Sequence, residues 1–294
     1  MIAVIGATGR IGSRVAALLA ERCVPAQALV RSPHVASLPL PAVHADLTDP
    51  ASIRAGLEGA SRLFLVTPHG PDQDLLEAVA VREAAAAGVH HVVKVSGGAA
   101  SLGPNGTTAT ATAHWRTEQL IERSGMGFTF LRPSYLQQNL LTQIAPIVAR
   151  AGLLIAPFGD APIAMVDARD VAACAVAALT GEVPAGEACQ LTGPRGVTFA
   201  DIAAHLGVRY VPLPPRAAGR MLRFRGASAS EVDHAVRMAT YFAAGADGVP
   251  TDHVTRRTGS PPRPVERLLD EEHDRFAPTT GLARRLSHPT TNEV

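Results

Sequence analysis

Over the first 133 residues, short apolar runs alternate with longer amphipathic stretches. The predicted strands are Ile2–Gly6, Ala26–Arg31, Ala42–Ala45, Arg62–Thr67, His91–Ser96 and Gly127–Arg132. The predicted helices are Ile11–Arg22, Pro50–Glu58, Asp72–Ala87 and Ala111–Ser124. Nearly continuous Val/Ile/Leu/Phe strands are typical of a parallel sheet covered by helices on both faces. We therefore predict an α/β fold with a Rossmann-type doubly wound parallel sheet.

The alternation is less regular after Pro133. Further strands are predicted at Leu153–Pro157, Pro162–Val166, Ala188–Thr192 and Arg209–Leu213, and further helices at Ser134–Arg150, Val171–Leu179, Thr198–Leu206 and Leu222–Ala244. This pattern indicates a Rossmann domain over residues 1–150 and a smaller α+β substrate lobe over 151–275, partly interleaved with the first. Residues 276–294 are rich in Pro, Arg, Thr and Ser, and we expect a flexible tail there.

Composition narrows the class of protein. The chain has 294 residues, is 47% hydrophobic and carries a formal charge of +1, which excludes a largely disordered chain and disfavours a dedicated nucleic-acid surface. Three widely spaced cysteines argue against a disulfide framework or a zinc site, and the histidines show no metal-ligand spacing. Because no apolar run has the length of a membrane helix and no signal peptide is visible, we expect a cytoplasmic location.

A glycine motif, Gly6-Ala-Thr-Gly9-Arg-Ile-Gly12, follows the first predicted strand and opens the first predicted helix. In this context Gly6 permits the tight turn, Gly9 allows the backbone to approach a pyrophosphate, and Gly12 allows close packing of helix on strand. Free N–H groups at the helix start then face the anion. The motif predicts a dinucleotide site.

The end of the second predicted strand indicates which dinucleotide binds. An NAD site usually places an acid there for the ribose hydroxyls. This sequence instead has Arg31-Ser32-Pro33, and the Arg31 guanidinium suits a 2′-phosphate, so NADP(H) is favoured over NAD(H). Arg10 can reach the same phosphate. Asp46, before Leu47, is either an adenine contact or a turn residue.

These motifs, together with those that follow them in order over residues 1–270, resemble the NmrA-like branch of the atypical short-chain dehydrogenases/reductases. The later motifs are Val93-Lys-Val-Ser96, His114…Glu118, Thr129-Phe-Leu-Arg-Pro133…Gln138-Asn139, Asp167-Ala-Arg-Asp170, Leu191-Thr-Gly193 and Thr258-Gly-Ser-Pro-Pro262. The resemblance implies a Rossmann domain with a smaller C-terminal lobe. Relatives in this branch include type 2 NAD(P)H:quinone reductases and NADP-binding regulators without known turnover.

The chain departs from the usual short-chain reductases at the proton donor. Those enzymes use a Tyr four residues before a Lys, whereas alignment on Gly125–Pro133 places His114 at the Lys position and Thr110 at the Tyr position. His114, as in the type 2 quinone reductases, is our candidate to donate a proton or bind the cofactor ribose, with simple packing as the alternative. Ser96, at the end of the fifth predicted strand, is a second catalytic candidate that can orient a carbonyl oxygen. Lys94, the only lysine, either supports such groups or is a structural residue extending past the helix layer.

We thus predict an NADPH-dependent reductase that transfers hydride to a quinone or conjugated carbonyl; the alternative is a non-catalytic NADP(H)-sensing regulator. The predicted cofactor residues are Gly6, Thr8, Gly9, Arg10, Ile11, Gly12, Arg31, Ser32, Asp46, Leu47, Thr67, Pro68, Ser96 and His114. Tyr135, Gln138 and Asn139 are candidates for substrate contact, with core packing as the alternative. Apolar side chains at Met221–Phe242 favour an aromatic substrate if some of them line a pocket. We expect a small-molecule substrate, no nucleic-acid or membrane partner, and a monomer or homodimer.

Overall fold

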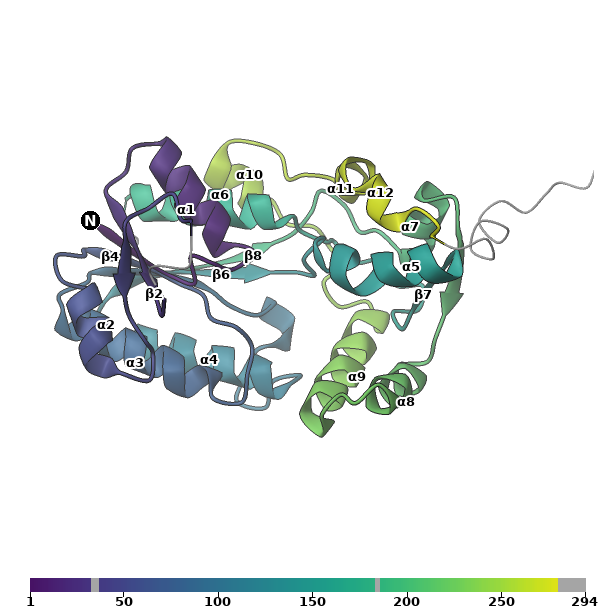
Figure 1. The fold of residues 1–294 in the computed structure, drawn as a ribbon, viewed down its shortest axis with the longest axis horizontal. Helices are drawn as coiled ribbons and strands as arrows, with labels where there is room; N and C mark the ends of the chain where they lie inside the picture. Colours follow the sequence, from purple (N-terminus) through teal and green to yellow (C-terminus); the bar gives the residue numbers. More distant parts are fainter. Residues whose placement is uncertain (33–36, 183–185, 280–294) are drawn as a thin grey trace, which may run out of the picture. The chain divides into compact units, whose positions relative to one another are not determined.

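The computed structural model describes residues 1–32, 37–182 and 186–279, and contains a seven-stranded parallel sheet (Figure 1). Its strands are β1 (Ile2–Ile5), β2 (Ala26–Val30), β3 (Ala42–His44), β4 (Arg62–Leu65), β5 (His91–Val95), β6 (Gly127–Pro133) and β8 (Glu187–Leu191). They lie in the order β3-β2-β1-β4-β5-β6-β8, and every neighbouring pair is parallel. The predicted doubly wound Rossmann-type fold is confirmed.

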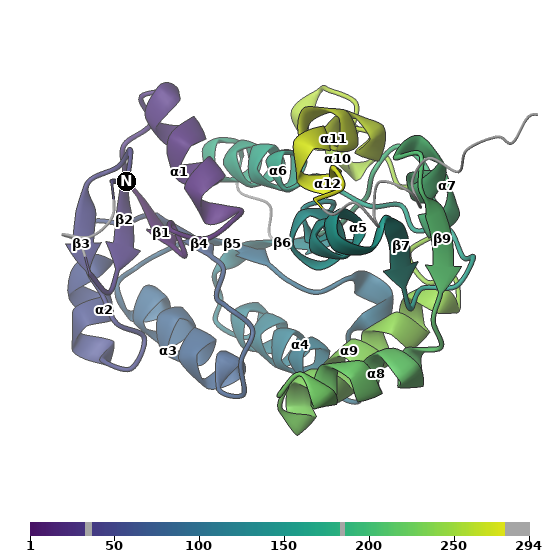
Figure 2. The same ribbon diagram turned by 45° about the vertical axis from the view of Figure 1, so that its right-hand side comes forward.

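Helices cover both faces of this sheet (Figures 1 and 2). One face carries α1 (Gly12–Glu21), α6 (Ala168–Thr180) and α10 (His253–Thr258), and the other carries α2 (Pro50–Gly56), α3 (Gln73–Ala86) and α4 (Ala109–Glu122). Local sequence sets several helix starts. Asp49 accepts a hydrogen bond from the Ala51 amide ahead of Pro50, and Thr108 accepts one from the Ala111 amide.

Burial on both faces of the sheet explains why the central strands consist of nearly continuous apolar residues. Leu63, Phe64, Leu65, Val92 and Phe130 are fully buried, because both faces of the central strands are covered. Because β1, β4 and β5 run parallel, their carboxyl ends lie at one edge of the sheet. Open α/β sheets bind their ligands at this edge.

The chain divides into two compact units whose boundaries differ from the expected break at residue 150. Among the described residues, unit 1 contains those within 1–133, 168–191 and 252–261, and unit 2 contains those within 134–167, 192–251 and 262–279. The chain returns to unit 1 because β8 pairs with β6, from Thr129–Glu187 to Pro133–Leu191, and α10 packs on α6 and β8. Residues 134–150 belong to unit 2. The positions from 280 onward in the expected tail, and Pro33, lie outside the described residues.

Unit 2 combines a small parallel sheet with helices. Its elements are β7 (Leu153–Ala156) paired with β9 (Arg209–Pro212), and α5 (Ala145–Ala151), α7 (Phe199–His205), α8 (Pro215–Phe224), α9 (Ala229–Ala243), α11 (Val265–Glu271) and α12 (His273–Phe276). Its described core includes Tyr135, Phe158, Phe199 and Phe242, whose rings pack against one another.

Three predicted elements of unit 2 were wrong in detail. Residues 134–138 are not helical; a π-helical turn at Leu140–Ile144 leads into α5, whose first turn contains Pro146. The predicted strand Pro162–Val166 consists of isolated bridges, Leu136 with Val166 and Ile163 with Val197. The predicted helix Leu222–Ala244 is two helices, because Gly226 has φ +89° and Ser228 begins α9 with a capping box.

Candidate active site

The glycine loop of unit 1 connects β1 to α1 through a tight turn. Gly6 has φ +87°, and its carbonyl accepts a hydrogen bond from the Gly9 amide at 3.0 Å. A Cβ at Gly12 would lie 2.1 Å from the Gly6 carbonyl oxygen, so only glycine permits the helix to start this close to the loop. A Cβ at Gly9 would meet that same oxygen at 3.3 Å and no other atom within 4 Å. Thr8, Gly9 and Arg10 are exposed and Ile11 is buried, so the outer side of the loop is open to an anion.

The residues expected at the adenosine end follow the next two strands of the sheet. Arg31 and Ser32 follow β2 and are exposed, while Asp46 and the half-buried Leu47 follow β3. The Asp46 carboxylate accepts hydrogen bonds from the Thr48 amide at 2.9 Å and the Thr48 hydroxyl at 2.8 Å, which is the turn role expected as one alternative. These bonds, with weaker contributions from Arg31 and His44, lower the pKa of Asp46.

A buried ion pair lies behind the carboxyl ends of β4 and β5. Lys94 of β5 and Glu77 of α3 are both fully buried, and Lys94 Nζ lies 2.7 Å from Glu77 Oε2. Thr67, just after β4, donates its hydroxyl hydrogen to Glu77 Oε1 at 2.8 Å. The interpretation of Lys94 as a residue extending past the helix layer is therefore wrong: the ammonium ends inside unit 1, in an ion pair.

The same ammonium contacts His114. Lys94 Nζ lies 3.3 Å from His114 Nδ1 and 3.3 Å from the Val95 carbonyl oxygen. The amide nitrogen of Gln73 lies 3.1 Å from His114 Nδ1 and 3.3 Å from Nε2. Burial, followed by the positive charge of Lys94 and the nearby His69, holds the pKa of His114 well below its usual range. The imidazole is therefore neutral at neutral pH.

Two buried polar atoms beside this network lack a hydrogen-bond partner among the described residues. They are Ser96 Oγ, at the carboxyl end of β5, and Gln73 Oε1. A Cβ at Gly97, next to Ser96, would lie 3.4 Å from His114 Cδ2, so the ring edge adjoins the Ser96–Gly97 backbone. A glycine cradle and two orphaned polar atoms, all in unit 1, fit a nucleotide with a polar carboxamide-bearing ring. Thr67 is buried and Pro68 is exposed in the same region of the sheet edge.

Helix α4, which carries His114, is held against the sheet one turn further on. Arg132 of β6 donates to both carboxylate oxygens of Glu118, at 3.0 Å and 2.6 Å. Only 2% of the Glu118 side chain is exposed, so this bidentate pair is well shielded from solvent. The pair fixes the position of α4, and with it the height of His114 along β5.

The predicted substrate residues lie in unit 2. Tyr135 is buried in the aromatic cluster with Phe158, Phe199 and Phe242, and its hydroxyl donates to Gln143 Oε1 at 3.2 Å. Gln138 donates to Asp167 Oδ1 at 2.8 Å, and Asn139 is half-buried. Tyr135 and Asn139 do not share a helix face, because residues 134–138 are not helical. Tyr135 therefore packs as a core residue, and substrate contact by these three residues stays a prediction.

Gln73 and Glu77 were absent from the sequence-based predictions, although the chain carries a signal for them. The buried face of α3 includes Ala80, Val81 and Ala84. Extending that face toward the start of the helix at intervals of three and four residues gives Glu77 and Gln73. Polar side chains on the core face of a helix require buried partners, which Lys94 and His114 supply.

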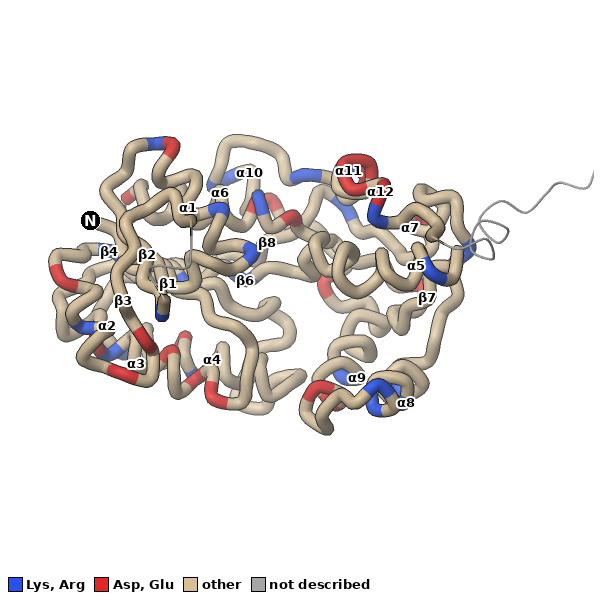
Figure 3. The backbone as a smooth tube through the Cα atoms, in the orientation of Figure 1, with Lys and Arg blue, Asp and Glu red and all other residues tan. Residues whose placement is uncertain are grey.

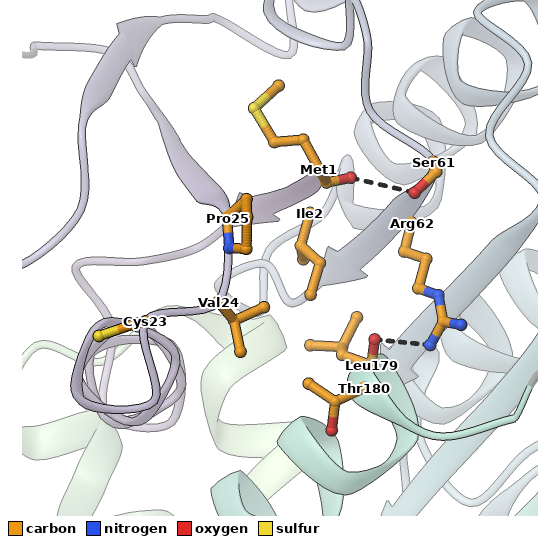
Figure 4. Close-up of a pocket in the computed structure, with 9 residues that line it drawn as sticks. All are labelled: Met1, Ile2, Cys23, Val24, Pro25, Ser61, Arg62, Leu179 and Thr180. Carbon is orange, nitrogen blue, oxygen red and sulfur yellow. Dashed lines mark hydrogen bonds between the residues drawn. The ribbon is translucent and has the colours of Figure 1, made fainter.

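A surface pocket lies at the opposite, amino-terminal edge of the sheet (Figure 4). It is lined by the starts of β1 and β4, the loop before β2 and the end of α6. The Arg62 guanidinium there donates to the carbonyl oxygens of Leu179 and Gly181, at 2.6 Å and 2.8 Å. Because these carbonyls already occupy the guanidinium, we do not assign the reaction to this pocket.

Charged residues of both signs are interspersed along the described chain, with arginines on α8 (Figure 3). None of the described helices combines the length and apolar character needed to cross a membrane.

The chain belongs to the NAD(P)H-binding family, whose model matches residues 6–182. A reductase of Streptomyces griseus, (4-alkanoyl-5-oxo-2,5-dihydrofuran-3-yl)methyl phosphate reductase, is 36% identical over 95% of this chain and 100% of its own. NAD(P)H azoreductase of Xenophilus azovorans is 34% identical over 90% and 94%. Quinone oxidoreductase 2 of Escherichia coli is 32% identical over 70% and 73%. The predicted class of cofactor, a nicotinamide nucleotide, is confirmed.

Solved structures agree on the fold. The NADPH complex of the Escherichia coli NADPH-dependent quinone oxidoreductase has a TM-score of 0.83 at 25% identity, covering 92% of this chain and 99% of that one. The NADP(H) complex of Citrobacter triphenylmethane reductase has a TM-score of 0.80 at 23% identity, covering 92% and 99%. Both carry the same Rossmann-like architecture as this chain.

Proposed function

We propose that this protein is an NADPH-dependent reductase that transfers hydride to a quinone or a related conjugated carbonyl compound. The observation that carries the proposal is the buried Lys94–His114 network at the carboxyl edge of β5, in the same unit as a dinucleotide-type glycine loop. The three relatives are reductases or oxidoreductases by name, and the azoreductase is named for NAD(P)H, which supports the proposal.

The relatives share a type of acceptor. Their names specify an azo compound, a quinone and a dihydrofuranone that bears an alkanoyl group. Each is a conjugated π system in which negative charge from hydride addition spreads onto an electronegative atom. Such an acceptor needs little protonation during hydride transfer, which fits a chain that has Thr110 and His114 at the positions of the usual Tyr and Lys.

The cofactor residues in this proposal all belong to unit 1. Gly6, Thr8, Gly9, Arg10, Ile11 and Gly12 form the pyrophosphate site, where free backbone N–H groups at the start of α1 face the anion. Arg31 and Ser32 bind the 2′-phosphate, with Arg10 assisting, and Asp46 and Leu47 flank the adenine. Thr67, Pro68 and Ser96 lie at the nicotinamide half, and bound NADPH supplies the hydride.

On the substrate side, His114 and Ser96 polarise the acceptor oxygen. The substrate in this proposal is aromatic, with Tyr135, Gln138 and Asn139 as candidate contacts. We propose that the chain acts as a monomer or homodimer in the cytoplasm.

The decisive experiment follows loss of the reduced-nicotinamide absorbance when purified protein is mixed with NADPH and a panel of acceptors. The panel contains a benzoquinone, a naphthoquinone, an acyl dihydrofuranone and an azo dye. We expect turnover with at least one quinone or conjugated carbonyl. NADPH binding without turnover on any member of the panel would contradict the enzyme assignment and favour the NADP(H)-sensing regulator.

The 2′-phosphate assignment is tested by Arg31→Asp. Loss of a charge-assisted hydrogen bond, replaced by repulsion, should weaken NADPH binding by about 10-fold to 100-fold and leave NADH binding within about 3-fold. The matched control is Arg22→Asp, which makes the same charge change on an exposed residue at the far end of α1. Equal weakening of both nucleotides by Arg31→Asp would remove Arg31 from the 2′-phosphate site.

A further inference from the structure

The chemistry of His114 depends on which ring nitrogen carries its hydrogen, and the contacts of Lys94 decide this. A lysine ammonium has three N–H donors and no acceptor. Lys94 Nζ has Glu77 Oε2 at 2.7 Å, the Val95 carbonyl oxygen at 3.3 Å and His114 Nδ1 at 3.3 Å. The first two partners are acceptors, and the third must be an acceptor as well.

An accepting Nδ1 carries no hydrogen, so the hydrogen of the neutral ring lies on Nε2. Gln73 does not select the opposite tautomer, because its amide nitrogen lies almost equally far from Nδ1 and Nε2, at 3.1 Å and 3.3 Å. A second proton on the ring would point an N–H at a buried ammonium. The Lys94 contact therefore disfavours both the Nδ1–H tautomer and the imidazolium.

We propose that Lys94, anchored by Glu77 and Thr67, is a positioning residue that holds His114 as the neutral Nε2–H tautomer, so that His114 offers the substrate a hydrogen-bond donor and no ionisable proton. The catalytic part of this inference rests on the proposed function. In a quinone reduction, hydride addition produces a hydroquinone monoanion; the Nε2–H group stabilises its oxygen by hydrogen bonding, and water supplies the remaining proton. The hydride carries two electrons and one hydrogen to the quinone, and the proton taken from water completes the hydroquinone and leaves hydroxide in the solvent.

The charged and titratable groups around the His114 ring are consistent with this state. Lys94 of β5 and His69 after β4 both disfavour a positive ring. Glu77 of α3 is engaged by Lys94 and Thr67, and Glu118, one turn along α4, is engaged by Arg132. Both carboxylates that could favour an imidazolium are therefore already bound to cations.

The test is direct observation of the ring nitrogens by NMR. Protein labelled with ¹⁵N-histidine is examined by long-range ¹H–¹⁵N correlation from about pH 5.5 to about pH 8, on both sides of the ordinary imidazole pKa of ~6.5. Signals missing from His114→Gln identify His114. We expect one unprotonated nitrogen, Nδ1, and one protonated nitrogen, Nε2, with no change across this range. A proton on Nδ1, or titration of His114 within the range, would overturn the inference.

The double variant Lys94→Met/Glu77→Gln tests the cause, since it removes both charges of the pair together. We expect His114 to stay neutral across the range, because burial still disfavours the imidazolium, and to populate both tautomers. An unchanged His114 spectrum would show that Lys94 does not set its state. If the variant does not fold, the wild-type spectrum still decides the tautomer.

Kinetics separate this inference from the proposed function. With NADPH and a quinone, kcat of the wild type should show no inflection over the same pH range, and His114→Ala, which has no donor, should lower kcat by about 10-fold to 100-fold. A wild-type inflection that follows titration of His114 would contradict the neutral-donor role. Absence of any turnover would refute the proposed function while the NMR assignment stands.

Discussion

The Lys94–Glu77 ion pair makes a quantitative prediction about stability. Both side chains are fully buried, so Lys94→Met leaves the Glu77 carboxylate without a cation in the interior of unit 1. The carboxyl group can escape by taking up a proton. At pH 7 this costs about 1.36 × (7 − 4.3), or ~3.7 kcal/mol, relative to the unfolded chain, where the carboxyl has its ordinary pKa. This value is the upper limit of the charge penalty and agrees with the ~3–5 kcal/mol typical of a broken buried pair.

The sign of the pH dependence follows from the same reasoning. In Lys94→Met the folded-state pKa of Glu77 is raised above its unfolded value, so stability is lost as pH rises and regained as pH falls. The penalty should shrink to ~1 kcal/mol at about pH 5. Glu77→Gln should behave in the opposite way, because an unpaired Lys94 must lose its proton. That penalty is at most ~4.6 kcal/mol at pH 7 and falls to ~2 kcal/mol at about pH 9.

The assay is equilibrium unfolding in urea followed by the fluorescence of Trp115, the only tryptophan, which lies next to His114 on α4 of unit 1. The double variant Lys94→Met/Glu77→Gln is the control, since it carries neither charge. Its stability should exceed that of both single variants at pH 7 and should lack their pH dependence. Destabilisation by Lys94→Met that is below ~1 kcal/mol, or equal at pH 5 and pH 7, would refute the reasoning.

Two further predictions concern other parts of unit 1. Gly12→Ala places a Cβ 2.1 Å from the Gly6 carbonyl oxygen, so the loop must shift. We expect at least a 10-fold loss of NADPH affinity in a binding titration. Unchanged affinity would show that the loop does not bind the nucleotide. Burial, aided by the charge of Arg62, lowers the pKa of His91 to about 4, so the unfolded chain binds a proton that the folded chain rejects. The free energy of unfolding should therefore fall by up to about 3 kcal/mol between pH 6.5 and pH 4. In urea unfolding, His91→Gln should remove this contribution to the pH dependence. The same pH dependence in His91→Gln as in the wild type would exclude His91 as its source.

The first half of the chain was largely predictable because its information is local. Each strand of unit 1 is a short apolar run between turn or capping residues, and each run became a strand with ends within about two residues of those expected. The glycine loop was equally readable, since its spacing and its position between a strand and a helix are both sequence features. His114 was found through its distance from Gly125–Pro133.

Unit 2 was less predictable because its segments have few local signals. Residues 134–138 alternate between apolar and polar side chains in a helix-compatible pattern. The Gln137 and Val166 amides instead donate hydrogen bonds between this segment and residue 166, and Leu136 forms an isolated bridge with Val166. Pro162–Val166 has the composition of a strand but pairs only at single residues. Both outcomes depend on contacts between segments that are distant in sequence.

By itself, the sequence determined the doubly wound fold of unit 1, the glycine loop and the place of His114, because periodicity and glycine spacing act through neighbouring residues. Only the tertiary structure decided the state of His114. Lys94, Glu77 and Gln73 come from different elements, and their effect on the imidazole arises when folding removes water from all of them at once. The tertiary structure likewise decided the role of Lys94, the only lysine, because folding buries it against Glu77, seventeen residues earlier in the chain.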